Sequence, residues 1–205
     1  MKSGFRPLIT PFSISTDHFK YVIKQDPSFD WHTITEASFV NDFVSSELKI
    51  GDVLGTSNPA LSKFKNHGGK LITYHGLADP LIFPRGTDDY ARRVAAQFGG
   101  FAGAQTFYRY FRYPNAGHCG GAGINGTDLF NALVNWVENG VAPDFFVATV
   151  STGRTRKVCK FPDTQVYNGS GSTDDAANFT CQVNANDDPA LVAQDILARY
   201  NHENE

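Results

Sequence analysis

The clearest indication of the fold class is the stretch GGKLITYHGLADP, residues 68–80. Residues 70–75 are rich in β-forming side chains and are bounded by glycines, as expected for a short buried strand. A loop follows over 76–86. A helix is then predicted from Thr87 to the glycines after Phe98, because its apolar side chains recur on one stripe.

The same order of strand, loop and helix recurs downstream. Residues 106–113 carry aromatic side chains on both faces, as a buried strand does. A glycine-rich loop over 115–126 then leads to a helix that Thr127 and Asp128 are expected to cap. Consecutive units of this kind predict parallel strands joined by right-handed crossovers. We therefore expect an α/β fold, with both loops at the carboxyl edge of one sheet.

The N-terminal segment shows weaker patterns. Residues 1 to about 30 have no sustained period and contain prolines, so extended or loop structure is expected there. A helix is predicted over 33–49, with Thr35 or Ser38 as its cap, and it is expected to end before Gly51.

The remaining segments carry little periodic signal. Asn58 followed by Pro59 predicts the start of a short helix. Beyond residue 143 the chain is expected to be irregular until Pro189 opens a last helix. The sequence contains no internal repeat and no low-complexity tract, so neither a repeat array nor a disordered linker is indicated.

The composition indicates one folded domain that binds neither nucleic acid nor a membrane. The 205 residues are 41% hydrophobic and 13% aromatic, which is too apolar for a disordered chain. The net charge is −3, and no cluster of Lys or Arg is present to neutralise a run of phosphates. No apolar stretch approaches the roughly 20 residues that span a bilayer.

Cysteines and glycosylation sequons favour a secreted protein. Cys159 and Cys181 flank a segment rich in Gly, Ser, Asn and Asp, so a disulfide between them is predicted. In the chain-entropy model this loop closure contributes about 3 kcal/mol. Three sequons predict N-linked glycans on Asn125, Asn168 and Asn178. The alternative is a set of buried thiols in a reducing cytosol.

One cysteine is left over. Cys119 is then either a free thiol or bonded to a partner outside this chain. The first residues do not resemble a secretory leader, because prolines interrupt the short apolar run after Arg6. Secretion is therefore expected without a signal peptide in this sequence.

Two side chains at the predicted strand ends suit acid–base chemistry. Asp79 follows the first strand and His118 lies in the loop after the second, in the chain order of the last two members of a Ser–Asp–His triad. In that chemistry the carboxylate accepts the Nδ1 proton of the imidazole, and Nε2 deprotonates a serine. The structural alternative is an Asp–Pro turn and a solvated His. His75 is expected only to make local hydrogen bonds.

The runs 68–82 and 113–123 closely resemble the tannase and feruloyl esterase family of secreted α/β-hydrolases. The resemblance extends with lower clarity from about Asp26 to Cys181, and it covers only the C-terminal part of a family member. It implies that residues 1–205 form the incomplete C-terminal part of one α/β-hydrolase domain. Within it, residues 1–35 are expected to be the tail of the lid insertion, and 143–205 an irregular segment stapled by the disulfide.

The resemblance also implies a partner and a cofactor outside this sequence. Family members carry a disulfide between a cysteine just before the nucleophilic serine and one just after the catalytic histidine. Cys119 matches the second position. It is therefore expected to bond to the missing N-terminal portion, as a separate disulfide-linked chain if the protein is processed. The family's calcium site is expected in the missing lid, so no cofactor is expected in this chain.

The nucleophile itself is missing from the sequence. A nucleophile elbow needs Gly-x-Ser-x-Gly, and no stretch supplies it. The segment 55–59 fails at its last position, and Ser170 lies downstream of His118, which is the wrong chain order. We therefore expect this chain to supply only Asp79 and His118 to a serine hydrolase of phenolic esters, such as feruloyl or galloyl esters, and to be inactive alone.

Three other functions are weighed against this one. A catalytically inactive, truncated or regulatory remnant of the family would keep the fold without the chemistry. A thiol enzyme using Cys119 is disfavoured, because the side chains of neighbouring residues such as Cys119 and His118 diverge. No metal site is predicted, since the acidic pairs 88–89 and 174–175 lack the alternating spacing of calcium ligands.

Overall fold

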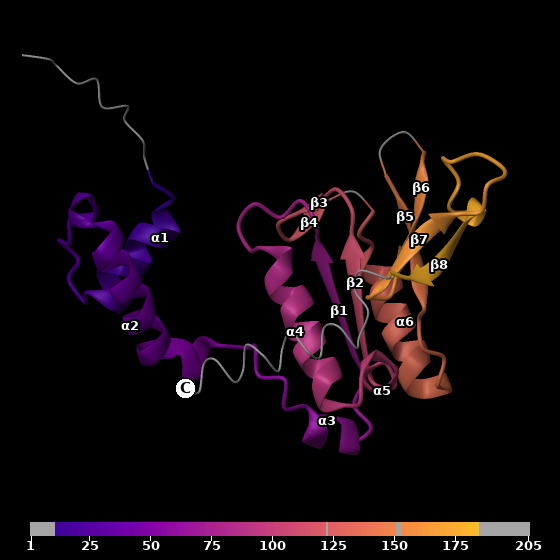
Figure 1. Cartoon of the computed structure of the whole chain (residues 1–205), viewed down its shortest axis with the longest axis horizontal. Coiled ribbons are helices and arrows are strands. Elements are labelled where there is room, and N and C mark those ends of the chain that lie inside the picture. Colours follow the sequence, from indigo (N-terminus) through magenta and orange to yellow (C-terminus); the bar gives the residue numbers. More distant parts are fainter. Residues whose placement is uncertain (1–10, 122, 151–152, 185–205) are drawn as a thin grey trace, which may run out of the picture. The chain divides into compact units, whose positions relative to one another are not determined.

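A computed structural model describes residues 11–121, 123–150 and 153–184, coloured along the chain in Figure 1. The chain divides into two compact units, Met1–Ser57 and Asn58–Glu205. The length alone indicates one domain, and the resemblance places a boundary near residue 35. The division between the two units falls after the long N-terminal helix has ended.

The Met1–Ser57 unit is helical. It contains α1 (Ser13–Asp17), the π-helix η1 (His18–Ile23), the 3-10 helix η2 (Trp31–Thr33) and α2 (Glu36–Leu54). The expectation of extended or loop structure is wrong for residues 13–23. The Phe19 ring packs on Phe29 and Phe39, with ring centroids 6.2 and 6.3 Å apart. These contacts span distances in sequence that a local pattern does not register.

The N-terminal cap of α2 is one that the sequence predicts, but the helix is longer than predicted. The Thr35 hydroxyl oxygen accepts from the Ser38 backbone amide at 3.1 Å, and the Ser38 hydroxyl oxygen accepts from the Thr35 backbone amide at 2.9 Å, which makes a capping box. The helix continues through Gly51 to Leu54, beyond the predicted end. A glycine inside a helix costs only about 1 kcal/mol, which is too little to stop it.

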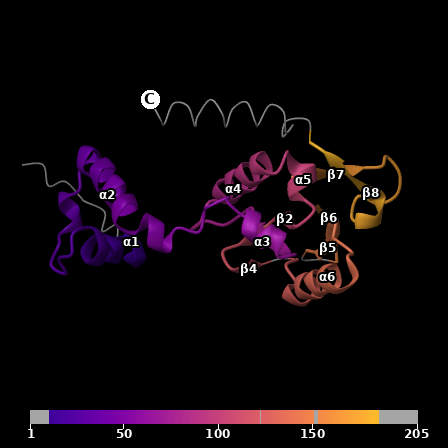
Figure 2. The ribbon, with the colours of Figure 1, turned by 90° about the horizontal axis from the view of Figure 1, so that it is seen from below.

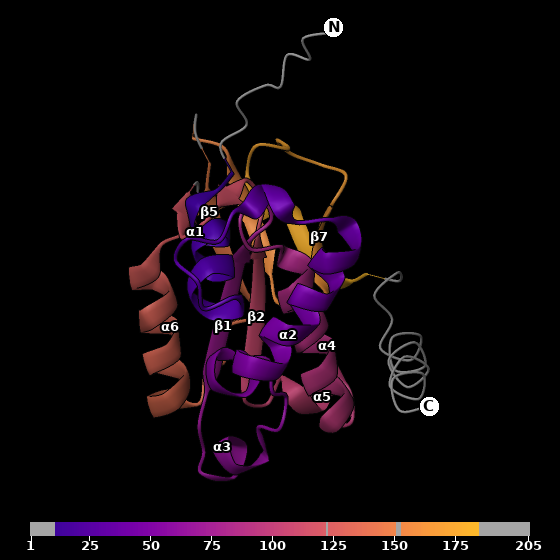
Figure 3. The same cartoon turned by 90° about the vertical axis from the view of Figure 1, so that its left-hand side faces the viewer.

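The centre of the Asn58–Glu205 unit is a parallel pair of strands, β1 (Leu71–Gly76) and β2 (Tyr108–Tyr113). Their register runs from Leu71 opposite Tyr108 to Gly76 opposite Tyr113, which confirms the predicted parallel pairing. Helices α4 (Pro84–Gln97) and α6 (Gly126–Asn139) lie on opposite faces of the pair (Figures 2 and 3). Short helices α3 (Ser62–Asn66) and α5 (Phe101–Ala104) accompany them.

Side chains of β2 alternate between two parts of the core. Tyr108 and Tyr110 pack with Val94 of α4 in one buried cluster. Phe111 and Tyr113 belong to a second cluster, which also contains residues of the strands farther along the chain. Burial on both faces explains the run of aromatic residues without the alternation typical of a half-exposed strand.

Three helix starts differ from prediction by a few residues. Helix α4 begins at Pro84 instead of Thr87, because the fixed φ of proline suits the first helical position. Helix α6 is capped by Asn125, whose Oδ1 accepts from the Thr127 amide at 3.0 Å. Asn58 makes a local turn by accepting from the Ala60 amide, and α3 starts only at Ser62.

The expectation of an irregular segment after residue 143 is wrong for 145–183. Strands β5 (Phe145–Thr149) and β6 (Thr155–Cys159) form one antiparallel pair, and β7 (Asp163–Tyr167) and β8 (Phe179–Val183) form another. The 3-10 helix η3 (Ala176–Asn178) precedes β8. Each strand has only five residues and is stabilised by pairing with the other strand of its pair.

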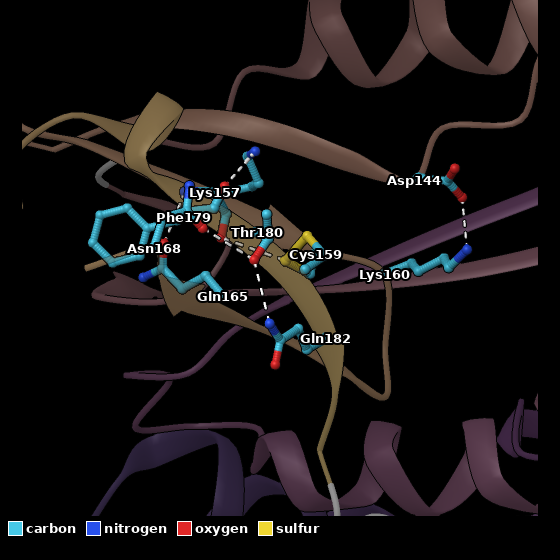
Figure 4. Close-up of a disulfide and its surroundings, with 10 residues drawn as sticks. Asp144, Lys157, Cys159, Lys160, Gln165, Asn168, Phe179, Thr180 and Gln182 are labelled. Atoms are coloured by element: carbon cyan, nitrogen blue, oxygen red, sulfur yellow. Dashed lines mark hydrogen bonds and ion pairs between the residues drawn. A yellow bond between two sulfur atoms is a disulfide. The ribbon is translucent and has the colours of Figure 1, made fainter. Parts of the chain in front are cut away.

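A disulfide joins the two antiparallel pairs. Cys159 at the end of β6 is bonded to Cys181 in β8 (Figure 4).

The predicted helix beginning at Pro189 lies outside the described residues. Among those residues, no helix is long and apolar enough to cross a membrane.

Candidate active site

The ends of β1 and β2 are joined by backbone hydrogen bonds. The Leu77 amide donates to the Tyr113 carbonyl at 2.9 Å, and the Ala78 amide donates to the Ala116 carbonyl at 3.0 Å. This approach requires glycine at position 76, because a Cβ there would lie 2.3 Å from the Ala116 carbonyl oxygen. The two loops that carry the candidate residues are therefore fixed to each other.

Asp79 is oriented by the turn that follows it. Its Oδ1 accepts from the backbone amides of Leu81 at 2.9 Å and Ile82 at 3.0 Å. The side chain is only 6% exposed. These two bonds use one carboxylate oxygen and leave Oδ2 for another partner.

His118 is presented by a tight hairpin. Strands β3 (Ala116–Gly117) and β4 (Gly120–Gly121) pair antiparallel, and His118 and Cys119 form the two-residue connection. The backbone of Cys119 is left-handed, with φ of 58°. A non-glycine residue in this conformation costs roughly 1–2 kcal/mol, so the turn holds an unfavourable residue immediately beside the imidazole.

The structure brings the two predicted residues together. His118 Nδ1 lies 3.1 Å from Asp79 Oδ2, within hydrogen-bonding distance. With Nδ1 as the donor to the carboxylate, Nε2 carries a lone pair and is available as a base. The His118 side chain is 35% exposed, whereas the carboxylate is nearly enclosed.

The surroundings favour the ionised form of Asp79. Desolvation of the enclosed carboxyl raises its pKa. The amide bonds from Ile82 and Leu81, together with the hydrogen bond and charge of His118, outweigh desolvation and lower the pKa to about 2. Asp79 therefore remains negative throughout the pH range in which an imidazole titrates.

A second imidazole lies against the same carboxylate. His75 Nε2 is 3.5 Å from Asp79 Oδ2 and 3.0 Å from the Ile82 carbonyl oxygen, and Nδ1 is 2.7 Å from the Thr87 hydroxyl. Sequence reasoning assigned His75 only local hydrogen bonds and missed its approach to Asp79. The sequence feature that indicates this contact is the position of His75 at the end of β1, four residues before Asp79.

The other predicted site residues are a cysteine beside His118 and three asparagines. Cys119 is exposed and unbonded within the described residues. Asn125 and Asn168 are exposed, and Asn178 is partly buried. Within the described ranges, no group of three or more His, Cys, Asp or Glu side chains is arranged to hold a metal ion.

Replacing Gly76 tests whether the contact between the loops is required. Gly76→Ala forces a methyl group into the Ala116 carbonyl, so we expect a loss of about 1–3 kcal/mol in unfolding free energy, measured by urea titration. The matched control is Gly86→Ala in α4, where no atom lies within 4 Å of the new Cβ. The control is expected to gain up to about 1 kcal/mol. Equal changes in unfolding free energy for the two variants would show that the close contact between Gly76 and Ala116 is not required.

The lowered pKa of Asp79 predicts a pH-dependent contribution to stability. The carboxyl titrates at 3.8 when unperturbed and at about 2 in the folded chain, so its contribution is full above 3.8 and disappears as the pH falls through about 2. Unfolding titrations should therefore show that Asp79→Asn is less stable than the wild type near neutral pH, and that the difference shrinks over this acidic range. A stability difference between the two proteins that stays constant over this pH range would contradict the lowered pKa of Asp79.

Comparison with known proteins identifies the family. The profile described as "Tannase and feruloyl esterase" matches residues 9–182. A probable feruloyl esterase of Arthroderma benhamiae is 37% identical over an alignment of 185 residues, which covers 85% of this chain and 34% of that protein. A mono(2-hydroxyethyl) terephthalate hydrolase of Piscinibacter sakaiensis is 39% identical over 62% of this chain and 22% of its own length.

A solved structure shows the same relation. The crystal structure of feruloyl esterase B from Aspergillus oryzae superposes with a TM-score of 0.73 at 32% identity, covering 84% of this chain and 38% of that one. The chain thus spans about a third of the length of these feruloyl esterases. Its fold is a portion of an α/β-hydrolase fold. The chain belongs to the tannase and feruloyl esterase family.

Proposed function

We propose that this chain supplies the acid and the base of a Ser–Asp–His triad to a secreted carboxylic ester hydrolase that acts on phenolic esters. The observation that carries the proposal is the 3.1 Å contact between Asp79 Oδ2 and His118 Nδ1 at the carboxyl ends of two paired parallel strands. Open α/β sheets place their chemistry at this edge.

Each group has a defined role in proton transfer. The Asp79 carboxylate holds the imidazole in the tautomer with hydrogen on Nδ1 and stabilises the imidazolium that forms. His118 Nε2 takes the proton of the serine hydroxyl during attack on the ester and returns it to the leaving alkoxide. The two amide bonds to Asp79 Oδ1 keep the carboxylate from rotating away.

The attacking serine is proposed to lie in another part of the protein. The sequence contains no Gly-x-Ser-x-Gly elbow, and the match covers only 34–38% of the length of the feruloyl esterases. The acyl-enzyme intermediate would form on that serine and be hydrolysed with His118 as the base.

The matched relatives support an aromatic ester as the substrate. They include feruloyl esterases and a terephthalate ester hydrolase, whose names denote esters of aromatic acids. We also propose that residues 1–35 are the tail of the lid insertion.

Activity measurements test the proposal. The isolated chain should not hydrolyse feruloyl or galloyl esters, and the complete polypeptide should. In the complete polypeptide, Asp79→Asn should lower kcat about 10⁴-fold, because the wrong imidazole tautomer is then favoured. Asp89→Asn removes an exposed carboxylate on α4 and serves as the matched control, with unchanged kcat.

Each contrary result has a separate meaning. Serine-inhibitor-sensitive hydrolysis by the isolated chain would place the nucleophile inside it. An active complete polypeptide that retains its kcat after Asp79→Asn would remove Asp79 from the triad. A complete polypeptide without activity on either ester class would instead favour an inactive or regulatory remnant.

We also propose that Cys119 is bonded to a cysteine outside this chain. Support comes from its exposure and from its place in the two-residue turn directly after His118. A disulfide there would tie the His118 loop to the segment that carries the nucleophile. Secretion, which we also propose, would preserve such a bond.

Peptide mapping without reduction tests the proposed bond in material from the native source. A peptide containing Cys119 should be linked to a peptide from outside this sequence, as a separate subunit or as part of one longer chain. The Cys159–Cys181 crosslink in the same digest is the internal control for intact disulfides. Direct alkylation of Cys119 before any reduction would show that the bond is absent.

A further inference from the structure

Two of the three sequons lie side by side at one end of the β7–β8 hairpin. Asn168 directly follows β7 and Asn178 directly precedes β8. The backbone amide of Asn168 donates to the backbone carbonyl of Asn178 at 2.9 Å. Their sequences, Asn-Gly-Ser and Asn-Phe-Thr, both satisfy the acceptor rule. The local sequence therefore does not choose between them, but their side chains lie in different surroundings.

The Asn168 side chain is open to modification. The residue is exposed, and its Oδ1 accepts from the Thr180 hydroxyl at 3.2 Å (Figure 4). Its Nδ2 makes no hydrogen bond within the described part of the chain. Because an N-linked sugar replaces one hydrogen on Nδ2, the bond to Oδ1 is retained after modification. A glycan on Asn168 thus disturbs none of the contacts that hold the hairpin.

The Asn178 side chain is used by the fold. Its Nδ2 donates to the Ser172 carbonyl at 2.9 Å, and the residue is partly buried. The carboxamide also packs on Gly171, where an added Cβ would lie 2.6 Å from Cγ, Nδ2 and Oδ1. The Tyr167 hydroxyl holds the same glycine through its carbonyl at 2.6 Å. A sugar on Asn178 would need room beside Ser172 and Gly171, and it would leave Nδ2 a single hydrogen for the bond to Ser172.

We propose that the folded hairpin carries an N-linked glycan on Asn168 and leaves Asn178 unmodified. In the transfer, a bond forms between Asn168 Nδ2 and C1 of a lipid-diphosphate-linked oligosaccharide. The bond from C1 to the diphosphate breaks, and Nδ2 loses one proton. Folding of residues 171–178 competes with transfer to Asn178. In the cell this inference depends on the proposed secretion.

Glycopeptide mapping tests the choice between the two asparagines. The full chain is directed into the yeast secretory pathway by an added leader, and both secreted and retained protein are collected. Material with an intact Cys159–Cys181 crosslink is treated with peptide N-glycosidase in H₂¹⁸O, which marks each glycosylated Asn as labelled Asp. We expect label at position 168 and none at 178. Label at 178, or no label at 168, overturns the proposal.

A second variant separates protection by the fold from a poor acceptor sequence. Cys159→Ser removes the disulfide that anchors β8 without changing any residue near the sequon. Label at 178 should then appear, with label at 168 unchanged. Continued absence of label at 178 in this variant would overturn the proposal that the fold protects it. Because the leader is added, neither result depends on native secretion or on esterase activity.

Discussion

The parallel register between β1 and β2 determines where the rest of the site lies. Because Gly76 pairs with Tyr113, both strands end at the same level and the loops that follow begin side by side. The bond from the Ala78 amide to the Ala116 carbonyl then joins the loops. Asp79 and His118 are 39 residues apart in sequence, and the strand pairing together with this bond makes them neighbours.

The carboxylate of Asp79 serves the fold and the site at once. One oxygen closes the turn through two backbone amides, while the other faces the two imidazoles of His75 and His118. A carboxylate fixed in this way does not need to reorganise when charge develops on the imidazole, which is the property that an orienting group in proton transfer requires. The same bonds keep it ionised.

The C-terminal strands support the strand that carries the His118 loop. Phe111 and Tyr113 of β2 share a buried cluster with Ala148 of β5 and Val158 of β6. An isolated bridge also pairs Phe111 with Lys160, just after β6. The disulfide from β6 to β8 then connects the second hairpin to this support. Strands β5 and β6 are thus part of the framework of the site.

The order of strand, loop and helix, and the places of Asp79 and His118 after strands, could be predicted because they depend on local periods, glycines and prolines. The helices over 13–23 and the strands β5 to β8 could not be predicted in this way, since aromatic contacts and pairing between separate segments stabilise them. These features depend on the tertiary structure. It also decided that His75 faces Asp79, a contact made across a turn that periodicity does not encode.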